Sequence, residues 1–146
     1  MAMTHDEFLS VIKSRGAFIA PPATAAQIAH TNSVLQHIRA AILPMFMTNF
    51  FMATGGISLD SGYIFGPNEF ENGPRTPVPD IVSINRDISG LPNTVGKTIF
   101  GRNDLFWFAF DAFGTCYMLD NLTLRPLRKY DDPYRAITDC LIAGKF

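Results

Sequence analysis

Histidines and cysteines are the side chains of this sequence best suited to bind a metal ion, but their spacing argues against it. His30 and His37 fall seven residues apart on a predicted helix, so they share one side but are about 10 Å apart along the axis. A metal site on a helix wants ligands three or four residues apart and a third donor. The sequence has no His-Glu-x-x-His or Cys-x-x-Cys motif. It therefore predicts no metal site.

A nucleophile or an acid–base pair would have to come from the cysteines or the aspartates. Cys116 alternates with Tyr117 in a strand-like run and has no activating pattern around it. We expect Cys116 and Cys140 to be free, buried thiols. Five aspartates stand where turns and helix caps use this residue: Asp60, Asp111, Asp120, Asp131 and Asp132. A catalytic pair formed in space stays open, but structural roles are favoured.

Motifs for phosphate or dinucleotide binding are missing from the sequence. Gly96-Lys97-Thr98 lacks the preceding glycine that a phosphate-binding loop requires. No Gly-x-Ser-x-Gly elbow and no Gly-x-Gly-x-x-Gly segment occurs. We therefore expect neither a cofactor nor an enzymatic activity.

Charge and hydropathy exclude other classes of function. The net charge is −1 and the twelve basic residues are scattered, so we expect no direct binding to nucleic acid. No run of eighteen apolar residues and no cationic leader occurs, which favours a cytoplasmic protein without a membrane partner.

The 146 residues include thirteen phenylalanines and are 47% hydrophobic. They fit one domain, 1–146, with a dense aromatic core.

Helices are predicted near both ends of the chain. Thr4 with Glu7, and Thr24 with Gln27, have the spacing of capping boxes before apolar stripes. Proline and glycine punctuation marks the other helix ends. The predicted helices cover about residues 4–16, 24–42, 44–55, 81–88 and 132–144.

Strand-like runs occupy the second half of the chain. Leu105–Phe110 lacks polar alternation, so we expect a central strand that is covered on both faces. The polar connection 66–79 is either a contact surface or a simple surface crossover. The remaining predicted strands are 63–65, 97–100, 115–119 and, at an edge, 125–129. This pattern predicts an α+β fold, with a largely antiparallel sheet of five or six strands flanked by N-terminal helices and a C-terminal helix.

Two segments, 43–56 and 107–120, are similar in residue order and spacing to the signature of the SUKH superfamily. In the first, Leu43-Pro44 opens a helix and Gly55-Gly56 closes it. In the second, a strand leads through Asp111 and Gly114 into another strand that ends at Asp120. With the flanking helices, the resemblance covers about residues 22–141. We expect these motif residues to form the scaffold of a SUKH-like domain, a role in which they need not touch a partner.

The resemblance also implies a function. The superfamily includes bacterial toxin-immunity proteins and a fungal cell-wall assembly regulator. It implies a non-enzymatic protein that binds a cognate polymorphic toxin domain in the cytoplasm and occludes it. The alternative is a regulatory or scaffold interaction module without a toxin. A homo-oligomer also stays open, because the apolar third helix could be buried within one chain or against a second copy.

Candidate partner-binding residues are chosen for their expected exposure and not from the family motif. Four lie in the long polar connection, namely Asn68, Glu69, Glu71 and Arg75. Three lie in the predicted hairpin turn, namely Arg102, Asn103 and Asp104. Loops that connect packed elements often carry binding residues.

Overall fold

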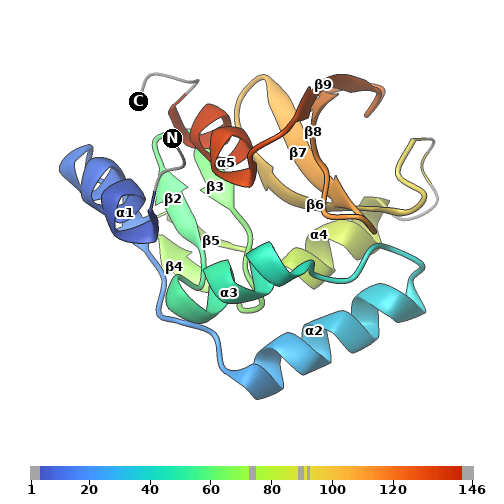
Figure 1. The fold of residues 1–146 in the computed structure, drawn as a ribbon, viewed down its shortest axis with the longest axis horizontal. Helices are drawn as coiled ribbons and strands as arrows, with labels where there is room; N and C mark the ends of the chain where they lie inside the picture. Colours follow the sequence, from blue (N-terminus) through green and yellow to red (C-terminus); the bar gives the residue numbers. More distant parts are fainter. Residues whose placement is uncertain (1–3, 73–74, 89–90, 92, 143–146) are drawn as a thin grey trace.

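The computed structural model describes residues 4–72, 75–88, 91 and 93–142. It confirms the predicted α+β class: helices pack on a large antiparallel sheet (Figure 1). The helices are α1 (His5–Ser14), α2 (Ala25–His37), α3 (Met45–Ala53), α4 (Ile81–Ile88) and α5 (Pro133–Ile142). The strands are β1 (Phe18–Ile19), β2 (Ile57–Leu59), β3 (Gly62–Ile64), β4 (Phe70–Asn72), β5 (Arg75–Val78), β6 (Lys97–Arg102), β7 (Phe106–Asp111), β8 (Cys116–Asp120) and β9 (Pro126–Tyr130).

The main sheet has seven strands where five or six were predicted. Its order is β1-β2-β3-β6-β7-β8-β9, and every neighbouring pair is antiparallel. The prediction missed β1 and β2, which have two and three residues. All three residues of β2 are buried, so the strand has no polar alternation that could reveal it.

The connection 66–79, predicted to be irregular, contains a two-stranded hairpin formed by β4 and β5. Phe70 of β4 anchors this hairpin, because its ring stacks on Phe18 of β1 at a centroid distance of 5.8 Å. The hairpin is thus held against the β1 edge of the main sheet.

The start of α2 and its predicted capping box are confirmed. Thr24 Oγ1 accepts a hydrogen bond from the backbone N–H of Gln27, and the Gln27 side chain accepts one from the N–H of Thr24. Pro44 is the residue before α3 and not its first residue. The second helix ends at His37, earlier than predicted, and Arg39 then adopts a left-handed conformation with φ of 64°. This turn lets the N–H of Ala40 bond to the carbonyl of Leu35.

The C-terminal helix packs across the sheet, from β2 to β9. Glycines allow its close approach: a Cβ at Gly62 would lie 2.7 Å from the carbonyl oxygen of Cys140, and one at Gly101 would lie 3.0 Å from its Sγ. Within β7, Phe108, Ala109 and Phe110 are all buried. The predicted central strand is thus confirmed with both faces covered at residues 108–110, but Phe106 and Trp107 are only half-buried, and Leu105 is exposed and lies before the strand.

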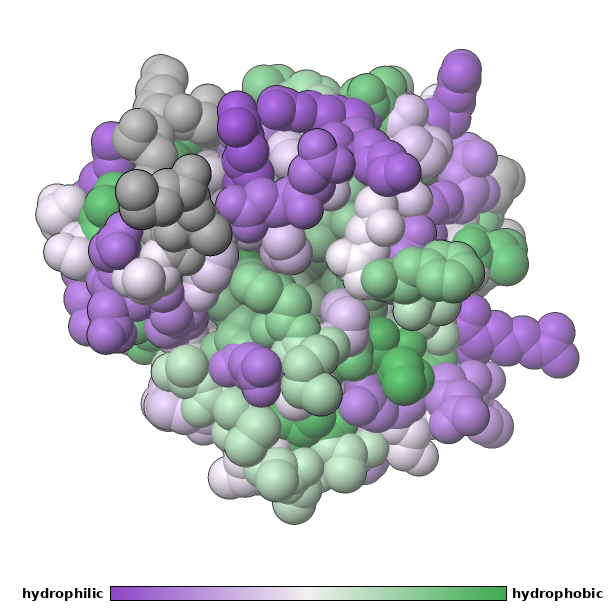
Figure 2. Space-filling view, in the orientation of Figure 1, coloured by the Kyte–Doolittle hydropathy of each residue, from purple (hydrophilic) through white to green (hydrophobic). Residues whose placement is uncertain are grey.

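The surface seen in Figure 2 is divided by hydropathy. Hydrophobic side chains gather over α3 and the start of α2, whereas the part over α5 and β9 is largely hydrophilic (Figure 2). None of the described helices has both the length and the apolar character needed to span a bilayer.

Candidate functional site

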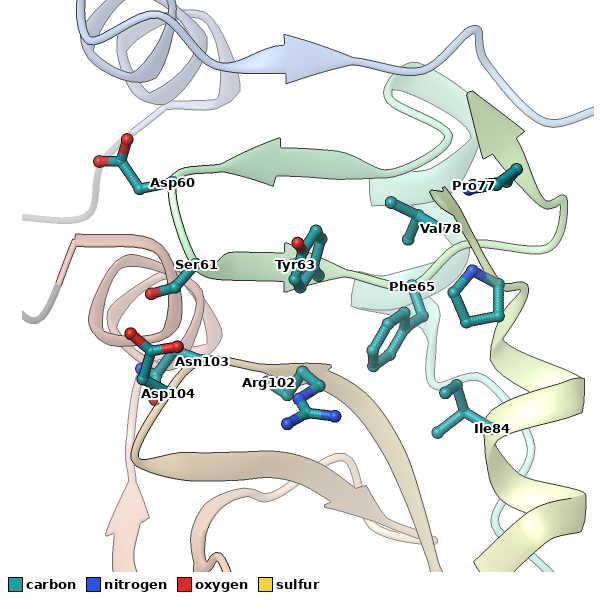
Figure 3. A pocket seen from close by; sticks show the side chains of 11 residues that line it. Asp60, Ser61, Tyr63, Phe65, Pro77, Val78, Ile84, Arg102, Asn103 and Asp104 are labelled. Carbon is teal, nitrogen blue, oxygen red and sulfur yellow. The ribbon is translucent and has the colours of Figure 1, made fainter. Parts of the chain in front are cut away.

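A groove of about 560 Å³ lies between the main sheet, α4 and the β4–β5 hairpin (Figure 3). Its apolar lining comes from α4, β3, β5 and the residues that directly follow these two strands, and its polar lining comes from two hairpin turns and the end of β6. The apolar residues include Tyr63, Phe65, Val78 and Ile84, with prolines at 77 and 79. The polar residues are Asp60, Ser61, Arg102, Asn103 and Asp104. Three of the seven predicted contact residues thus line one cavity.

The two turns have well-defined local causes. Leu59 pairs with Gly62 across a two-residue turn, in which Asp60 has φ of 52°. Aspartate tolerates this left-handed conformation better than most residues. In the second turn, Asn103 Oδ1 accepts hydrogen bonds from the N–H groups of Leu105 and Phe106, both at 2.9 Å.

Asn103 also ties this turn to the C-terminal helix. Its Nδ2 donates to the carbonyl of Cys140 at 3.2 Å, with Asp139 O at 3.5 Å. Both ends of the amide are therefore engaged within the chain, which gives Asn103 a positioning role for the turn. Asp104 beside it is exposed and makes no side-chain hydrogen bond to the described residues.

A row of three large side chains crosses the sheet beside the groove. Tyr63 of β3 pairs with Arg102 of β6, and Arg102 pairs with Trp107 of β7. Directly paired residues of antiparallel strands point to the same face. The guanidinium carbon of Arg102 lies 4.5 Å from the centre of the Trp107 ring. All three side chains are half-buried, so each keeps a surface that a ligand could reach.

Arg102 makes no ion pair with a carboxylate in the part of the chain that the structure describes. By contrast, Arg128 pairs with Asp139 at 3.0 Å. Stacking on Trp107 therefore holds the Arg102 side chain in place while its N–H donors stay available.

The other predicted contact residues lie outside this lining. Asn68, Glu69 and Glu71 are exposed, and they occur in or just before β4. Arg75 begins β5, but its side chain is outside the described part of the structure. The hairpin lines the groove with its other strand, through Pro77 and Val78. Contact by these four residues stays a prediction.

The aspartates of the family-like segments organise turns. Asp111 Oδ1 accepts hydrogen bonds from the N–H groups of Phe113 and Thr115, and its Oδ2 accepts one from the Tyr117 hydroxyl, which raises the pKa of Tyr117. Asp120 Oδ2 accepts from the N–H groups of Thr123 and Leu122, which lower the pKa of its carboxyl. Both carboxylates are thus engaged in holding a β-hairpin together.

The other motif residues support close packing. Leu43 is buried, and its N–H donates to Asn32 Oδ1 at 2.9 Å. Gly114 has φ of 82°, and a Cβ there would lie 3.3 Å from Pro44 Cβ. Gly55 has no room for a Cβ beside the carbonyl oxygen of Pro21. These residues join the α3 segment to the sheet and to the N-terminal chain.

Neither cysteine lines the groove, although Cys140 Sγ lies 3.4 Å from the carbonyl oxygens of Tyr63 and Arg102 behind it. Both are free and buried. Burial raises the pKa of Cys116 to about 12, and it raises the pKa of Cys140 as well. Neither thiol is thus an activated nucleophile. Among the described residues, no three His, Cys, Asp or Glu side chains are grouped to hold a metal ion.

No protein-family model matches the chain, and no curated protein matches its sequence. The groove and the row of side chains beside it are therefore the structural basis for a functional proposal.

Tyr63 and Trp107 belong to this site but were not predicted as contact residues. Trp107 is the single tryptophan of the chain, within a run expected to be buried on both faces. Its pairing with Arg102 depends on a β-bulge between Ile99 and Gly101, which shifts the register of β6 against β7. Gly101 is a local signal for that shift, because a glycine within a strand often marks a bulge, but it does not reveal which residues then pair.

Proposed function

We propose that this protein is a non-enzymatic domain that binds another protein through the groove and the row formed by Tyr63, Arg102 and Trp107. The observation that carries this proposal is the composition of the row. Tyrosine, tryptophan and arginine are the residues most enriched in binding hot spots. Here they stand side by side on paired strands and remain partly accessible.

The apolar lining of the groove supports the same proposal. Phe65 and Val78 are almost fully buried, whereas Ile84 and Tyr63 are half-buried at the open side. A side chain of a partner that enters here would remove apolar surface from water, at about 25 cal/mol per Å². A stable interface buries about 800 Å² on each partner, so the contact would extend beyond the groove. The exposed segment of Asn68, Glu69 and Glu71 is our candidate for its rim.

The more specific proposal is toxin immunity. The similarity of residues 43–56 and 107–120 to SUKH sequences supports it, because that superfamily includes immunity proteins. In this role the protein would neutralise a cognate bacterial toxin in the cytoplasm by occluding it, without catalysis. Asp111 and Asp120 would contribute by shaping the hairpins and not by touching the toxin.

The alternative, a regulatory or scaffold module, has its own supporting observation. Several large apolar side chains are well exposed away from the groove lining, and they include Ile42, Met45 and Phe113, the last with 94% of its surface exposed. The Phe113 turn adjoins the start of α3 through the contact of Gly114 with Pro44. A second apolar surface would suit a module that joins two partners or associates with itself.

Co-purification from native cells tests the proposal. Wild type, Arg102→Glu and Tyr63→Ala would be compared with the control Lys129→Glu, which reverses an exposed charge on β9. We expect wild type and control to retain one protein at stoichiometric yield. The two groove variants should retain it at least about tenfold less, because losing a hot-spot contact costs about 2 kcal/mol or more. Thermal unfolding of each variant checks that it folds.

The identity of the retained protein separates the alternatives. A toxin domain whose activity is blocked by the wild-type protein would support immunity. A regulatory protein would support the scaffold alternative. Retention of no protein by wild type would contradict the proposal, and equal retention by the groove variants would contradict the proposed surface.

A further inference from the structure

We infer that the groove recognises an acidic side chain, an Asp or Glu in an extended segment of the partner, through the guanidinium group of Arg102. This inference rests on the proposed protein-binding function and specifies the chemistry of the partner at the same site.

The first support is the state of Arg102 itself. Its guanidinium group is stacked on Trp107 at 4.5 Å and has no carboxylate partner among the described residues. Figure 3 shows this side chain among the residues that line the groove, below the Phe65 and Tyr63 side chains in that view. A stacked guanidinium loses little further freedom on binding, and its planar fork matches a carboxylate with two hydrogen bonds.

The second support is the apolar surface next to this charge. The rings of Tyr63 and Phe65 lie nearly parallel, with centroids 6.5 Å apart and an interplanar angle of 11°. With Val78 and Ile84 they form an apolar wall beside Arg102. A residue next to the acid in the partner segment can place an apolar side chain on this wall. The site therefore fits an acidic residue with an apolar neighbour.

The third support concerns how such a segment would be held. On the side of the hairpin, the groove is lined by Pro77 in β5 and by Pro79 just after it, and neither residue has a backbone N–H. A partner strand cannot receive hydrogen bonds from these positions, so addition of a strand to β5 is disfavoured here. Recognition must then depend on side chains. Arg102 is the cationic side chain that lines the groove.

Asp104 determines where along the groove the acid can bind. Its exposed carboxylate lies in the turn that follows Arg102 and would repel an acid placed at that end. The partner acid is therefore expected on the apolar side of Arg102, with a neutral or basic residue toward Asp104.

Short peptides of matched shape test this chemistry. The probes are Ac-Ala-Glu-Leu-Ala-NH2 and its Gln and Lys counterparts, titrated to about 10 mM, a range that detects millimolar affinity. The reporter is the indole N–H signal in a nitrogen-15 NMR spectrum, which is unique because the chain has one tryptophan. We expect the Glu peptide to shift this signal saturably. The Gln and Lys peptides should bind at least about tenfold more weakly, because they lose the charge-assisted pair.

Three variants that alter the charges or the guanidinium group of the site complete the test. Arg102→Gln should abolish the preference for the Glu peptide, and Asp104→Asn should preserve or strengthen it. Arg102→Lys keeps the charge but not the fork, and we expect intermediate binding. Preference for the Lys peptide with loss of binding in Asp104→Asn would overturn the inference. So would equal binding of the Glu peptide by Arg102→Gln, or no shift with the Glu peptide.

The cellular partner separates this inference from the proposed function. If wild type and Arg102→Gln retain the same protein equally, the acidic recognition is wrong while protein binding stands. If the Glu peptide binds as expected but wild type retains no protein from native cells, the proposed function fails while the chemistry of the groove stands.

Discussion

The side-chain amide of Asn85 makes the two backbone hydrogen bonds that a neighbouring strand would otherwise make with Ile99 of the main sheet. Its side chain is 3% exposed, and its Oδ1 accepts a hydrogen bond from Ile99 N–H at 2.8 Å while its Nδ2 donates to the Ile99 carbonyl at 2.9 Å. The same Nδ2 donates to Ile81 O within α4 at 2.7 Å. Strand β3 pairs with β6 only at Gly101 and Arg102, so Ile99 lies beyond that pairing. One amide thus attaches α4 to the edge left open in the sheet.

Replacing this amide should therefore be costly. We predict that Asn85→Leu lowers the free energy of unfolding by about 2–4 kcal/mol, because the buried backbone groups of Ile99 lose their partners. Urea denaturation measures the change. The matched control is Asn68→Leu at an exposed position, with an expected change within about 0.5 kcal/mol. Equal effects of the two substitutions would show that the amide bonds of Asn85 contribute little.

His5 links the N-terminal helix to two distant segments. Its Nδ1 lies 2.8 Å from the Tyr134 hydroxyl, and its Nε2 lies 2.8 Å from Thr54 Oγ1. The rings of Phe8 and Phe50 lie beside it, at centroid distances of 6.1 and 5.2 Å. Burial lowers the pKa of His5, and the nearby carboxylate of Asp6 opposes this effect only in part. The folded state therefore favours the neutral imidazole.

A pH dependence of stability follows from the lowered pKa of His5. As the pH falls, the imidazole of His5 takes up a proton near pH 6.5 in the unfolded state but only at a lower pH in the folded state. The stability that neutral His5 contributes is therefore complete above about pH 6.5 and is lost as the pH falls through the folded pKa. We predict that the free energy of unfolding falls between about pH 7 and pH 5. This slope should be smaller in His5→Gln, but unchanged in His30→Gln, which alters an exposed histidine of α2. Urea denaturation at several pH values measures it, and an undiminished slope in His5→Gln would contradict the assignment.

At the scale of elements, the chain leaves α3 through a crossing of three backbone segments. The N–H of Gly55 donates to Ala20 O at 3.2 Å, and the N–H of Ala20 donates to Gly56 O at 2.9 Å. A Cβ at Gly55 would collide with the carbonyl oxygen of Pro21, and one at Gly66 would collide with that of Gly55. The glycine pair was predicted as a helix stop. The structure adds that its first member is needed for close backbone contact.

Alanine substitutions can separate these two roles of glycine. Gly16 has φ of 88° but nothing within 4 Å of its Cβ position, so Gly16→Ala should cost only the strain of a left-handed residue, about 1–2 kcal/mol. Gly55→Ala must move the backbone of Pro21, and we predict a larger loss of about 3 kcal/mol or more. Thermal and urea unfolding compare the two. A smaller effect at Gly55 than at Gly16 would mean that the crossing relaxes easily.

At the scale of the whole molecule, one core joins helices from both ends of the chain to the sheet. Cys116 in β8 and Cys140 in α5 are 2% and 1% exposed within it. Burial raises the pKa of Cys116 to about 12, so few thiolates exist near neutral pH. The two thiols therefore report on the opening of different elements.

We predict that both thiols react with a disulfide reagent at pH 8 far more slowly than in the unfolded chain, because opening of the core must precede the reaction. In urea the two reactions should accelerate together with global unfolding. Single variants, Cys116→Ser and Cys140→Ser, assign each reaction. Faster labelling of Cys140 alone would show that α5 detaches from the sheet before the rest unfolds.

The sequence by itself determined the fold class and most of the elements. The cap of α2 at Thr24, the start of α3 after Pro44, α4 at Ile81–Ile88 and the central strand β7 all follow from signals within a few residues. Caps, prolines and apolar spacing act through local hydrogen bonds and sterics, so they can be recognised without the tertiary structure. Arg102, Asn103 and Asp104 were also predicted near the correct turn.

The tertiary structure alone decided the strand count and the composition of the groove. Strands β1 and β2 contain two and three residues and pair with each other although they are far apart in the chain, Phe18 with Ser58 and Ile19 with Ile57. Tyr63, Arg102 and Trp107 meet through register and a β-bulge, whereas Asn103 is directed inward by the end of α5. Two of these relations join residues far apart in the chain, Tyr63 with Arg102 and Asn103 with Cys140. They depend on how strands pair and helices pack, for which the local sequence carries no signal.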